Sequence, residues 1–380
     1  MRDVVIVGGL RTPIGKRNGM LKDIRPDELL ATVLDGLVKN LNIDSSEIED
    51  VIAGCVSQVG EQAGDIARIA SLIAGYPTTV PGTTIDRQCG SSQQALHFAS
   101  QAIQCGDMDA VVAAGVESMT RVPMFSSLQG TSFSPALLNK YEIVNQGESA
   151  ELIAEKWSLT RCDLDEFALK SHQKAVQALK SNKFANEILP IRLSNSIIFD
   201  TDEVPRAETT IEILGNLKPS FRENGVIHPG NSSAISDGAA AILLMSKEKA
   251  ESLHIRPKFK VLARAVVGSD PTLMLTGVIP ATNKVLEKVG LSINDIGIFE
   301  VNEAFAPVVL AWQKETGADR EKVNPNGGAI ALGHPLGASG VRLFISMINE
   351  MERSNIKYGL VTMCEGHGMA NATIIEKLDD

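Results

Sequence analysis

The chain has 380 residues, of which 44% are hydrophobic and 22% are charged, and its formal net charge is −10. This length predicts two or three core units, and the composition argues against a disordered chain. No basic block is present to neutralise phosphates, which argues against nucleic acid as a partner, and no apolar run approaches the roughly 20 residues of a membrane span.

The five cysteines are scattered without a CxxC spacing and stand at Cys55, Cys89, Cys105, Cys162 and Cys364. We therefore expect neither a disulfide framework nor a zinc site, and we predict no metal. The strand-like apolar run at 4–7 leaves no room for a signal peptide, so we expect a cytoplasmic protein.

Short apolar runs alternate with helical patterns in two stretches that follow one plan. In the first stretch, strands are predicted near 4–7, 51–56, 83–85 and 110–114, and helices near 27–39, 62–74 and 91–104. In the second, strands are predicted near 259–267, 296–301 and 359–363, and helices near 279–289, 304–316 and 338–351. This alternation predicts parallel βαβ units, so each half should be a layered α/β sheet with reactive groups beyond the carboxyl ends of its strands.

A segment of different texture, rich in Ser, Asn, Pro and charged residues, separates the two halves. We predict an N-terminal core domain of residues 1–118 plus about 236–256. An inserted loop domain that contacts a cofactor should cover 119–235, and a C-terminal core domain should cover 257–380.

Cys89 stands where a predicted strand gives way to small residues and then to a helix. Unpaired N–H groups and the positive end of the helix dipole should favour its thiolate, and the same N–H groups are suited to hold an oxyanion. The alternative is a buried small hydrophobe, the usual fate of a free cysteine. The setting favours a nucleophile for acyl transfer.

Three further motifs follow predicted strands or turns. They are Asn302-Glu303-Ala304-Phe305, Gly333-His334-Pro335 and Cys364-Glu365-Gly366-His367-Gly368. Taken alone, Asn302 would be an ordinary helix N-cap and Cys364 a hydrophobe at a strand end. The histidine is flanked by glycines, so a ligand can approach its imidazole closely.

In this order, the cysteine loop, Asn-Glu-Ala-Phe, Gly-His-Pro and Cys-x-Gly resemble the motifs of the thiolases, which make or split 3-ketoacyl-CoA. The resemblance covers nearly the whole chain and includes 115–119 and 230–240. It implies a duplicated, layered α-β-α-β-α fold with two mixed sheets and an inserted loop domain. It also implies reversible cleavage of 3-oxoacyl-CoA by CoA to acyl-CoA plus acetyl-CoA, or the reverse condensation. CoA would be a co-substrate, with no permanently bound cofactor.

The resemblance further implies catalytic roles. Cys89 would be the nucleophile that carries the acyl group, and His334 the base that activates it and donates to a second oxyanion site. Asn302 would hold a water that completes this second site, and Cys364 would move the proton at the α-carbon of acetyl-CoA. The N–H groups of Gly366 and Cys89 would form the first oxyanion hole.

The resemblance also implies contacts with the substrates. Arg206 is similar to the arginine that packs against the CoA adenine, although taken alone it could form a surface ion pair. Ser233 would hydrogen-bond the pantetheine arm, Phe305 would form the apolar wall beside it, and Met274 would line the acyl pocket. We expect 3-oxoacyl-CoA, acetyl-CoA and CoA as partners, and a homodimer or homotetramer.

Some features depart from the family pattern. Residues 143–148 lack the His-Met pair of short-chain biosynthetic thiolases, and the preceding loop is shorter. His367 stands where the family usually has glycine. Its imidazole either favours the Cys364 thiolate or points to solvent or a subunit contact. The run Gln93-Gln94-Ala95 resembles broad- or long-substrate thiolases.

Two other functions stay open, namely a catalytically reduced thiolase-like subunit that binds acyl-CoA or scaffolds a partner, and a ketoacyl-ACP synthase. The Asn-Glu-Ala-Phe motif argues against the first, and the turn at Cys364 argues against the second. We expect structural roles for Glu117 and Glu303. We assign no role to Cys55, Cys105, Cys162, His97, His172, His228 or His254.

Overall fold

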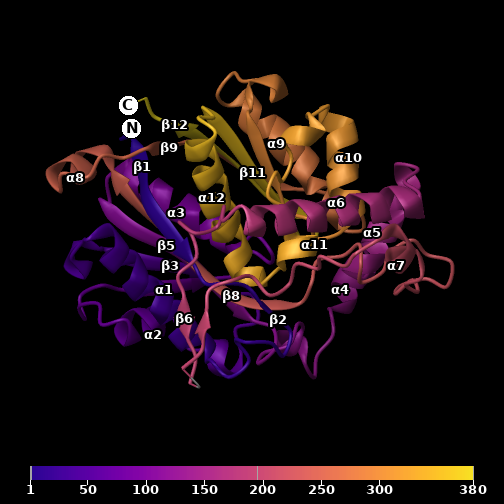
Figure 1. Ribbon diagram of the computed structural model, residues 1–380, viewed down its shortest axis with the longest axis horizontal. Coiled ribbons are helices and arrows are strands. Elements are labelled where there is room, and N and C mark those ends of the chain that lie inside the picture. The colour runs from indigo at the N-terminus through magenta and orange to yellow at the C-terminus, as the bar shows by residue number, and fades with distance from the viewer. Residues whose placement is uncertain (1, 195, 380) are drawn as a thin grey trace.

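One large mixed β-sheet runs through the molecule (Figure 1). The computed structural model describes residues 2–194 and 196–379, and within them the sheet has ten strands in the order β10-β11-β12-β9-β1-β8-β5-β3-β4, with β2 paired to β8. Its strands are β1 (Val4–Arg11), β2 (Gly15–Lys16), β3 (Asp50–Gly54), β4 (Gly82–Ile85), β5 (Ala110–Ser118), β8 (Ser236–Ser246), β9 (Phe259–Gly268), β10 (Ile298–Val301), β11 (Tyr358–Glu365) and β12 (Met369–Lys377). A separate hairpin joins β6 (Ile191–Arg192) and β7 (Ile198–Phe199).

Helices connect the strands and cover the sheet. They are α1 (Pro26–Leu41), α2 (Ile66–Ile73), α3 (Ser91–Cys105), α4 (Pro135–Leu138), α5 (Gln146–Lys156), α6 (Arg161–Lys180), α7 (Ile211–Gly215), α8 (Lys247–Ser252), α9 (Val278–Glu287), α10 (Ala306–Thr316), α11 (Ala329–Leu332) and α12 (Leu336–Arg353). The alternation of strands and helices in both halves agrees with the predicted layered α/β arrangement.

The two halves of the sheet are joined edge to edge. We expected two mixed sheets, and both half-sheets contain parallel and antiparallel strand pairs. Strand β3 pairs in parallel with β4 and β5, and β10 pairs in parallel with β11. Strands β8 and β12 run antiparallel to their neighbours. Strands β1 and β9 pair through Val5 with Lys260 and Ile6 with Phe259. This short ladder makes the half-sheets continuous.

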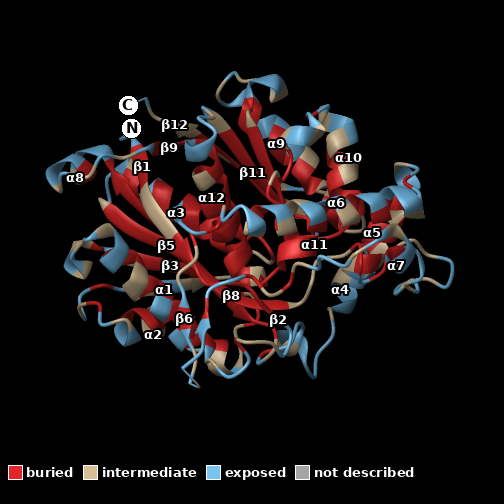
Figure 2. Ribbon diagram, in the orientation of Figure 1, coloured by how far each residue is buried: buried red, intermediate tan, exposed pale blue. Residues whose placement is uncertain are grey.

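Three hydrophobic clusters give the order of the layers. Helices α1 and α2 pack on β1, β3, β5 and β8, and α9 and α10 pack on the strands of the second half. Helices α3 and α12 lie between the half-sheets, since their apolar residues share one cluster with strands of both halves. Figure 2 shows α12 as one of the most buried helices. The helices α3 and α12 approach closely because residue 340 is glycine; a Cβ there would come 2.3 Å from the backbone nitrogen of Gln93.

The segment between β5 and β8 packs against the second half. Its helices α5 and α6 bury Ile153, Leu164 and Phe167 in the same cluster as Trp312 of α10. Thr160 and Asp163 form a capping box that starts α6. This packing sets the inserted segment over the strand ends where the predicted functional residues lie.

Among the described residues, no helix combines the length and the apolarity needed to cross a membrane. In the same part of the chain, no group of three or more His, Cys, Asp or Glu side chains is arranged to hold a metal ion.

Candidate active site

Two cavities meet at Cys89. The larger cavity, of about 780 Å³, is bordered by Cys89, His334, Arg206, Ser233 and Phe305. The smaller cavity, of about 440 Å³, is bordered by Cys89, Met274 and Gly366. The side chains common to both cavities are Cys89, Met124, Gln146 and Leu336. A reactant held at Cys89 therefore has space on two sides.

Cys89 lies on a tight turn between β4 and α3. Gln88, just before it, has a left-handed φ of 48°, and the Ser91 hydroxyl donates to the Gln88 carbonyl at 2.6 Å. The same hydroxyl accepts the N–H of Arg87 at 2.9 Å. These bonds fix the thiol at the start of the helix, where it is only 4% exposed.

The electrostatics of Cys89 differ from the prediction. Burial and, less strongly, Glu365 raise the pKa of the Cys89 thiol to about 12. The expected effect of the helix N-terminus is thus outweighed by desolvation, and the resting group is a thiol. A nucleophilic Cys89 consequently requires a nearby base.

His334 can serve as that base. It lies in the loop that follows α11. The backbone N–H of His334 donates to the Ala234 carbonyl at 3.1 Å, and the residue is 3% exposed. Burial and the nearby Arg342 lower the pKa of His334 to about 3, so the imidazole is neutral. Nδ1 lies 2.6 Å from the Ser339 hydroxyl, which itself donates to the Pro335 carbonyl. Ser339 must then accept from Nδ1–H, and Nε2 keeps its lone pair.

Asn302 lies against this imidazole. It follows β10, its backbone N–H donates to the Thr362 carbonyl at 3.1 Å, and its side-chain Nδ2 is 3.4 Å from Nε2 of His334. The helix-cap alternative is wrong, because α10 begins at Ala306 with Phe305 as the N-cap residue. The Oδ1 atom of Asn302 has no hydrogen-bond partner among the described residues, which leaves it available to water.

Cys364 and Gly366 come from the end of β11 and the turn after it. Burial raises the pKa of Cys364, and the next contribution comes from Cys89, so the two sulfurs are electrostatically coupled. Gly366 borders the smaller cavity together with Cys89. Cys364 and Asn302 are fully buried and border neither cavity. Asn302 contacts His334, which borders the larger cavity.

The predicted substrate contacts divide between the two cavities. Arg206, Ser233 and Phe305 border the larger cavity and Met274 the smaller one. The backbone N–H of Ser233 donates to the Ala304 carbonyl at 2.9 Å, which joins the serine loop to the Asn-Glu-Ala-Phe motif. The Arg206 side chain is exposed, and within the described chain no acid lies at ion-pair distance from it, so the ion-pair alternative is wrong.

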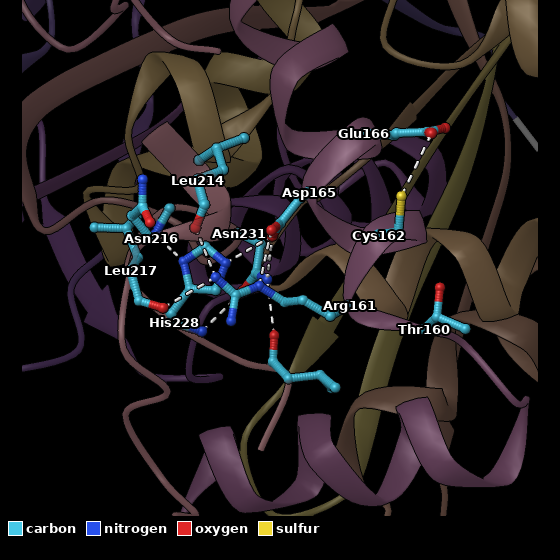
Figure 3. Close-up of polar contacts among 12 residues, drawn as sticks. Thr160, Arg161, Cys162, Asp165, Glu166, Leu214, Asn216, Leu217, His228 and Asn231 are labelled. Atoms are coloured by element: carbon cyan, nitrogen blue, oxygen red, sulfur yellow. Dashed lines mark hydrogen bonds and ion pairs between the residues drawn. The ribbon is translucent and has the colours of Figure 1, made fainter. Parts of the chain in front are cut away.

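A buried polar network holds the loop that carries Ser233 (Figure 3). Asp165 on α6 accepts from Nε2 of His228 at 2.6 Å and from the Asn231 amide at 3.1 Å. Its other oxygen accepts from Arg161 at 2.8 Å. Burial raises the pKa of Asp165, but the hydrogen bonds of His228 and Arg161 lower it overall. The ionised carboxylate therefore fixes the 226–234 loop.

Two buried carboxylates brace the site, as expected. Glu117 accepts the backbone N–H groups of Val56, Ser57 and Gly337 and the amide of Gln62. Its contact with Gly337 ties the end of β5 to the start of α12, beside His334. Glu303 accepts from Ser171, Asn324 and the Ile330 N–H and so joins α6 to α11.

Some residues at the site were not predicted. Ser339 orients His334, and His228 has an acidic partner. Lys16 and Arg17 border the larger cavity, and Lys16 forms an ion pair with Glu203, which borders the same cavity. Gln146 borders both cavities, and a Cβ on Gly366 would come 3.3 Å from its Nε2. His367 contacts Phe133 edge to face, whereas the charges that raise the pKa of Cys364 are those of Cys89 and Glu365.

Comparisons with known proteins agree with this geometry. The thiolase N-terminal domain model matches residues 4–248, and the thiolase C-terminal domain model matches residues 255–377. The steroid 3-ketoacyl-CoA thiolase of Mycobacterium tuberculosis is 46% identical over 100% of this chain and 95% of that protein. The 3-oxoadipyl-CoA/3-oxo-5,6-dehydrosuberyl-CoA thiolase of Escherichia coli is 43% identical over 100% of both chains.

Among solved structures, the acetyl-CoA acetyltransferase of Bacillus anthracis matches with a TM-score of 0.93 and 40% identity, over 100% of this chain and 99% of that one. The predicted fold class is thereby confirmed. The chain belongs to the thiolase family.

Proposed function

We propose that the protein is a thiolase that cleaves 3-oxoacyl-CoA with CoA, or runs the reverse condensation, through an acyl-enzyme on Cys89. The observation that carries this proposal is the placement of Cys89 at the junction of two cavities, with the neutral imidazole of His334 on the wall of the larger one. The full-length relatives named 3-ketoacyl-CoA thiolase support the substrate class.

In the first half-reaction, Nε2 of His334 accepts the proton of Cys89, and the thiolate attacks the 3-oxo carbon. The N–H groups of Cys89 and Gly366 stabilise the resulting oxyanion. When the bond between C2 and C3 breaks, the acyl group stays on the sulfur and the acetyl-CoA enolate forms. The protonated imidazole of His334, with a water held by Asn302, stabilises this enolate, and Cys364 protonates its carbon. His334 then passes its proton to the Cys364 thiolate, so the net transfer moves one proton from Cys89 to acetyl-CoA.

In the second half-reaction, CoA enters as the nucleophile. Its sulfur attacks the acyl-enzyme carbonyl, the bond from the carbonyl carbon to Cys89 breaks, and acyl-CoA leaves. One proton passes from CoA to Cys89, so the protein finishes unchanged. The raised pKa of Cys89 makes it a good proton acceptor at this stage, and the same oxyanion hole serves both halves.

The larger cavity is suited to hold CoA. Arg206 offers a guanidinium for stacking on the adenine, and Lys16 and Arg17 offer positive charge for the phosphates. Ser233 and Phe305 border the path from there to Cys89. We propose CoA as a co-substrate rather than a resident cofactor.

We also propose a homodimer or homotetramer located in the cytoplasm. Strand β4 ends the sheet order, so its outer edge offers unpaired backbone groups that a second copy can pair across a two-fold axis. Light scattering on a sizing column tests this assembly.

The test of the function is direct detection of the acyl-enzyme. The protein is mixed with acetoacetyl-CoA, quenched in acid and digested, and the peptide that contains Cys89 is weighed. We expect one acetyl group on this peptide and steady release of acetyl-CoA when CoA is added. Tight binding of acetoacetyl-CoA without acetylation would instead identify the catalytically reduced, acyl-CoA-binding subunit.

A further inference from the structure

The smaller cavity has more space than an acetyl group needs. Its volume of about 440 Å³ lies within the range of sites for small organic molecules, roughly 300 to 1,000 Å³, whereas an acetyl group has only three heavy atoms. It borders Cys89 and Gly366, and Arg206 and Ser233 border only the larger cavity. The smaller cavity can therefore hold the acyl part of a substrate separately from the CoA part.

The walls of the smaller cavity are mostly apolar. The apolar lining includes Phe125, Leu128, Phe133, Ile143, Val144 and Met274, and the polar lining includes Ser57, Gln88, Ser127, Asn145 and Gln146 besides Asp86 and His367. Phe125 is 59% exposed and Leu128 38% exposed, which is costly for large apolar side chains unless something covers them. An apolar acyl chain bound here would cover both.

His367 borders the smaller cavity, is exposed, and has a strained backbone conformation. Its φ of 64° is uncommon for a residue other than glycine and is retained where the surroundings or a function require it. The ring packs edge to face on Phe133, with centroids 5.4 Å apart. No described residue hydrogen-bonds to the ring nitrogens of His367, so these nitrogens are available to hydrogen-bond a ligand in the smaller cavity.

The charge on the border of the smaller cavity restricts the kind of polar group that fits. The exposed carboxylate of Asp86 borders the smaller cavity beside His367 and already accepts the Gln88 N–H at 2.7 Å. An acyl group ending in a carboxylate would meet this negative charge, whereas a hydroxyl or keto oxygen would not.

We propose that the smaller cavity binds acyl groups much larger than acetyl, with an apolar body and an uncharged oxygen near the far end, and that His367 is the residue that recognises this oxygen. The inference rests on the proposed thiolase function and specifies its substrate class. The substrates are then medium-sized 3-oxoacyl-CoA thioesters with a hydroxyl or keto group on the chain.

The experiment compares thiolysis of four substrates: acetoacetyl-CoA, 3-oxooctanoyl-CoA, and the same eight-carbon chain with a terminal hydroxyl or a terminal carboxylate. Each buried methylene is worth about fourfold in kcat/KM, so the plain eight-carbon chain should exceed acetoacetyl-CoA by at least about tenfold. The hydroxyl substrate should exceed the carboxylate substrate by about tenfold or more.

Variants assign these effects to residues. Ile143→Trp fills the smaller cavity and should reduce the eight-carbon to acetoacetyl ratio at least about fivefold. The control Ile198→Trp, at an exposed isoleucine on β7 that borders neither cavity, should not change this ratio. His367→Gly should reduce the ratio of hydroxyl to plain chain about three- to tenfold, as expected for one lost hydrogen bond. His367→Asn, which tolerates the same φ and keeps a donor, should restore most of it.

The outcomes separate this inference from the function on which it rests. If no substrate is cleaved and Cys89 is never acylated, the proposed function fails and this inference fails with it. If acetoacetyl-CoA is cleaved but the rates are flat across the series, or His367→Gly lowers all four rates equally, only the substrate class is overturned.

Discussion

The amide Nδ2 of Asn302 lies 3.4 Å from Nε2 of His334, while Nδ1 of the same ring lies 2.6 Å from the Ser339 hydroxyl. The two contacts act on opposite sides of the imidazole. Ser339 determines which nitrogen carries the proton, and Asn302 faces the nitrogen that is left with a lone pair. A neutral ring in this tautomer is ready to accept a proton from a thiol.

Replacing Ser339 by alanine should remove the acceptor for Nδ1–H. We expect kcat to fall about two- to tenfold, the effect of one lost hydrogen bond, with little change in KM, since Ser339 borders neither cavity. Steady-state kinetics measure kcat and KM, and a thermal melt measures the stability of the variant separately. Ser339→Thr keeps the hydroxyl and should recover most of kcat; equal kcat for the alanine variant and the wild type would refute the orienting role.

Replacing Cys89 by alanine should abolish the acyl-enzyme. We expect turnover to fall by at least about 10³-fold, because the reaction then has no covalent route. Cys105→Ala is the matched control, since Cys105 is exposed and borders neither cavity. Acetyl-CoA release from acetoacetyl-CoA and CoA is the measurement. Substantial turnover by the Cys89 variant would contradict the mechanism.

Much of the fold was predictable because both halves repeat strands and helices with clear periodicity. The motif residues Cys89, Asn302, His334 and Gly366 follow strands or tight turns, and such ends gather at one side of a layered sheet. The strands β8 and β12 were not predicted. The core of β8, Ala-Ala-Ala-Ile-Leu-Leu, is as compatible with a buried helix as with a buried strand.

The remaining features depend on contacts that no local pattern reveals. Ser339 has no sequence feature that distinguishes it from any other serine in a helix, and Asp165 and His228, which form a hydrogen bond, lie 63 positions apart in the chain. The protonation of Cys89 depends on complete burial and on Glu365, so the helix-terminus argument alone pointed in the wrong direction. Burial of this kind follows only from the packed fold.

Replacing Asp165 by asparagine should weaken both the fold and CoA binding. Breaking a buried ion pair costs about 3 kcal/mol, so we expect the free energy of unfolding to fall by about this amount. The 226–234 loop should then loosen and raise the KM for CoA, because it carries Ser233. Glu166→Gln, an exposed change on the same helix (Figure 3), should shift stability by less than about 0.5 kcal/mol. Chemical unfolding and kinetics at varied CoA test the prediction, and a stable variant with normal KM would exclude it.

Replacing Arg206 by alanine should raise the KM for CoA. Stacking of a guanidinium on an aromatic ring contributes about 0.5 to 2 kcal/mol, so we expect an increase of about three- to tenfold. The adenine is remote from the reacting atoms, and kcat should stay within about twofold. Arg192→Ala, on strand β6 and outside both cavities, is the control. An unchanged KM in the Arg206 variant would remove this residue from the CoA site.

Stability should decrease as the pH rises toward 8, in part because of Glu365. Its side chain is fully buried, its two oxygens lack hydrogen-bond partners among the described residues, and burial raises its pKa from 4.5 to about 8. Between these two pH values the folded state holds a proton that the unfolded state has released. The free energy of unfolding must then fall with pH, by up to about 1.4 kcal/mol per pH unit for one such group.

The variant Glu365→Gln keeps the shape of the neutral acid and cannot ionise. We expect its stability to match the wild type near pH 4.5 and to exceed it increasingly up to pH 8. Burial also raises the pKa of Glu300 to about 8, so Glu300 contributes in the same direction. The Glu365 variant should therefore lose only part of the decrease in the free energy of unfolding with pH. Urea unfolding at several pH values gives both curves. Parallel curves across this range would show that Glu365 is already ionised in the folded protein, since a neutral buried acid must release its proton on unfolding.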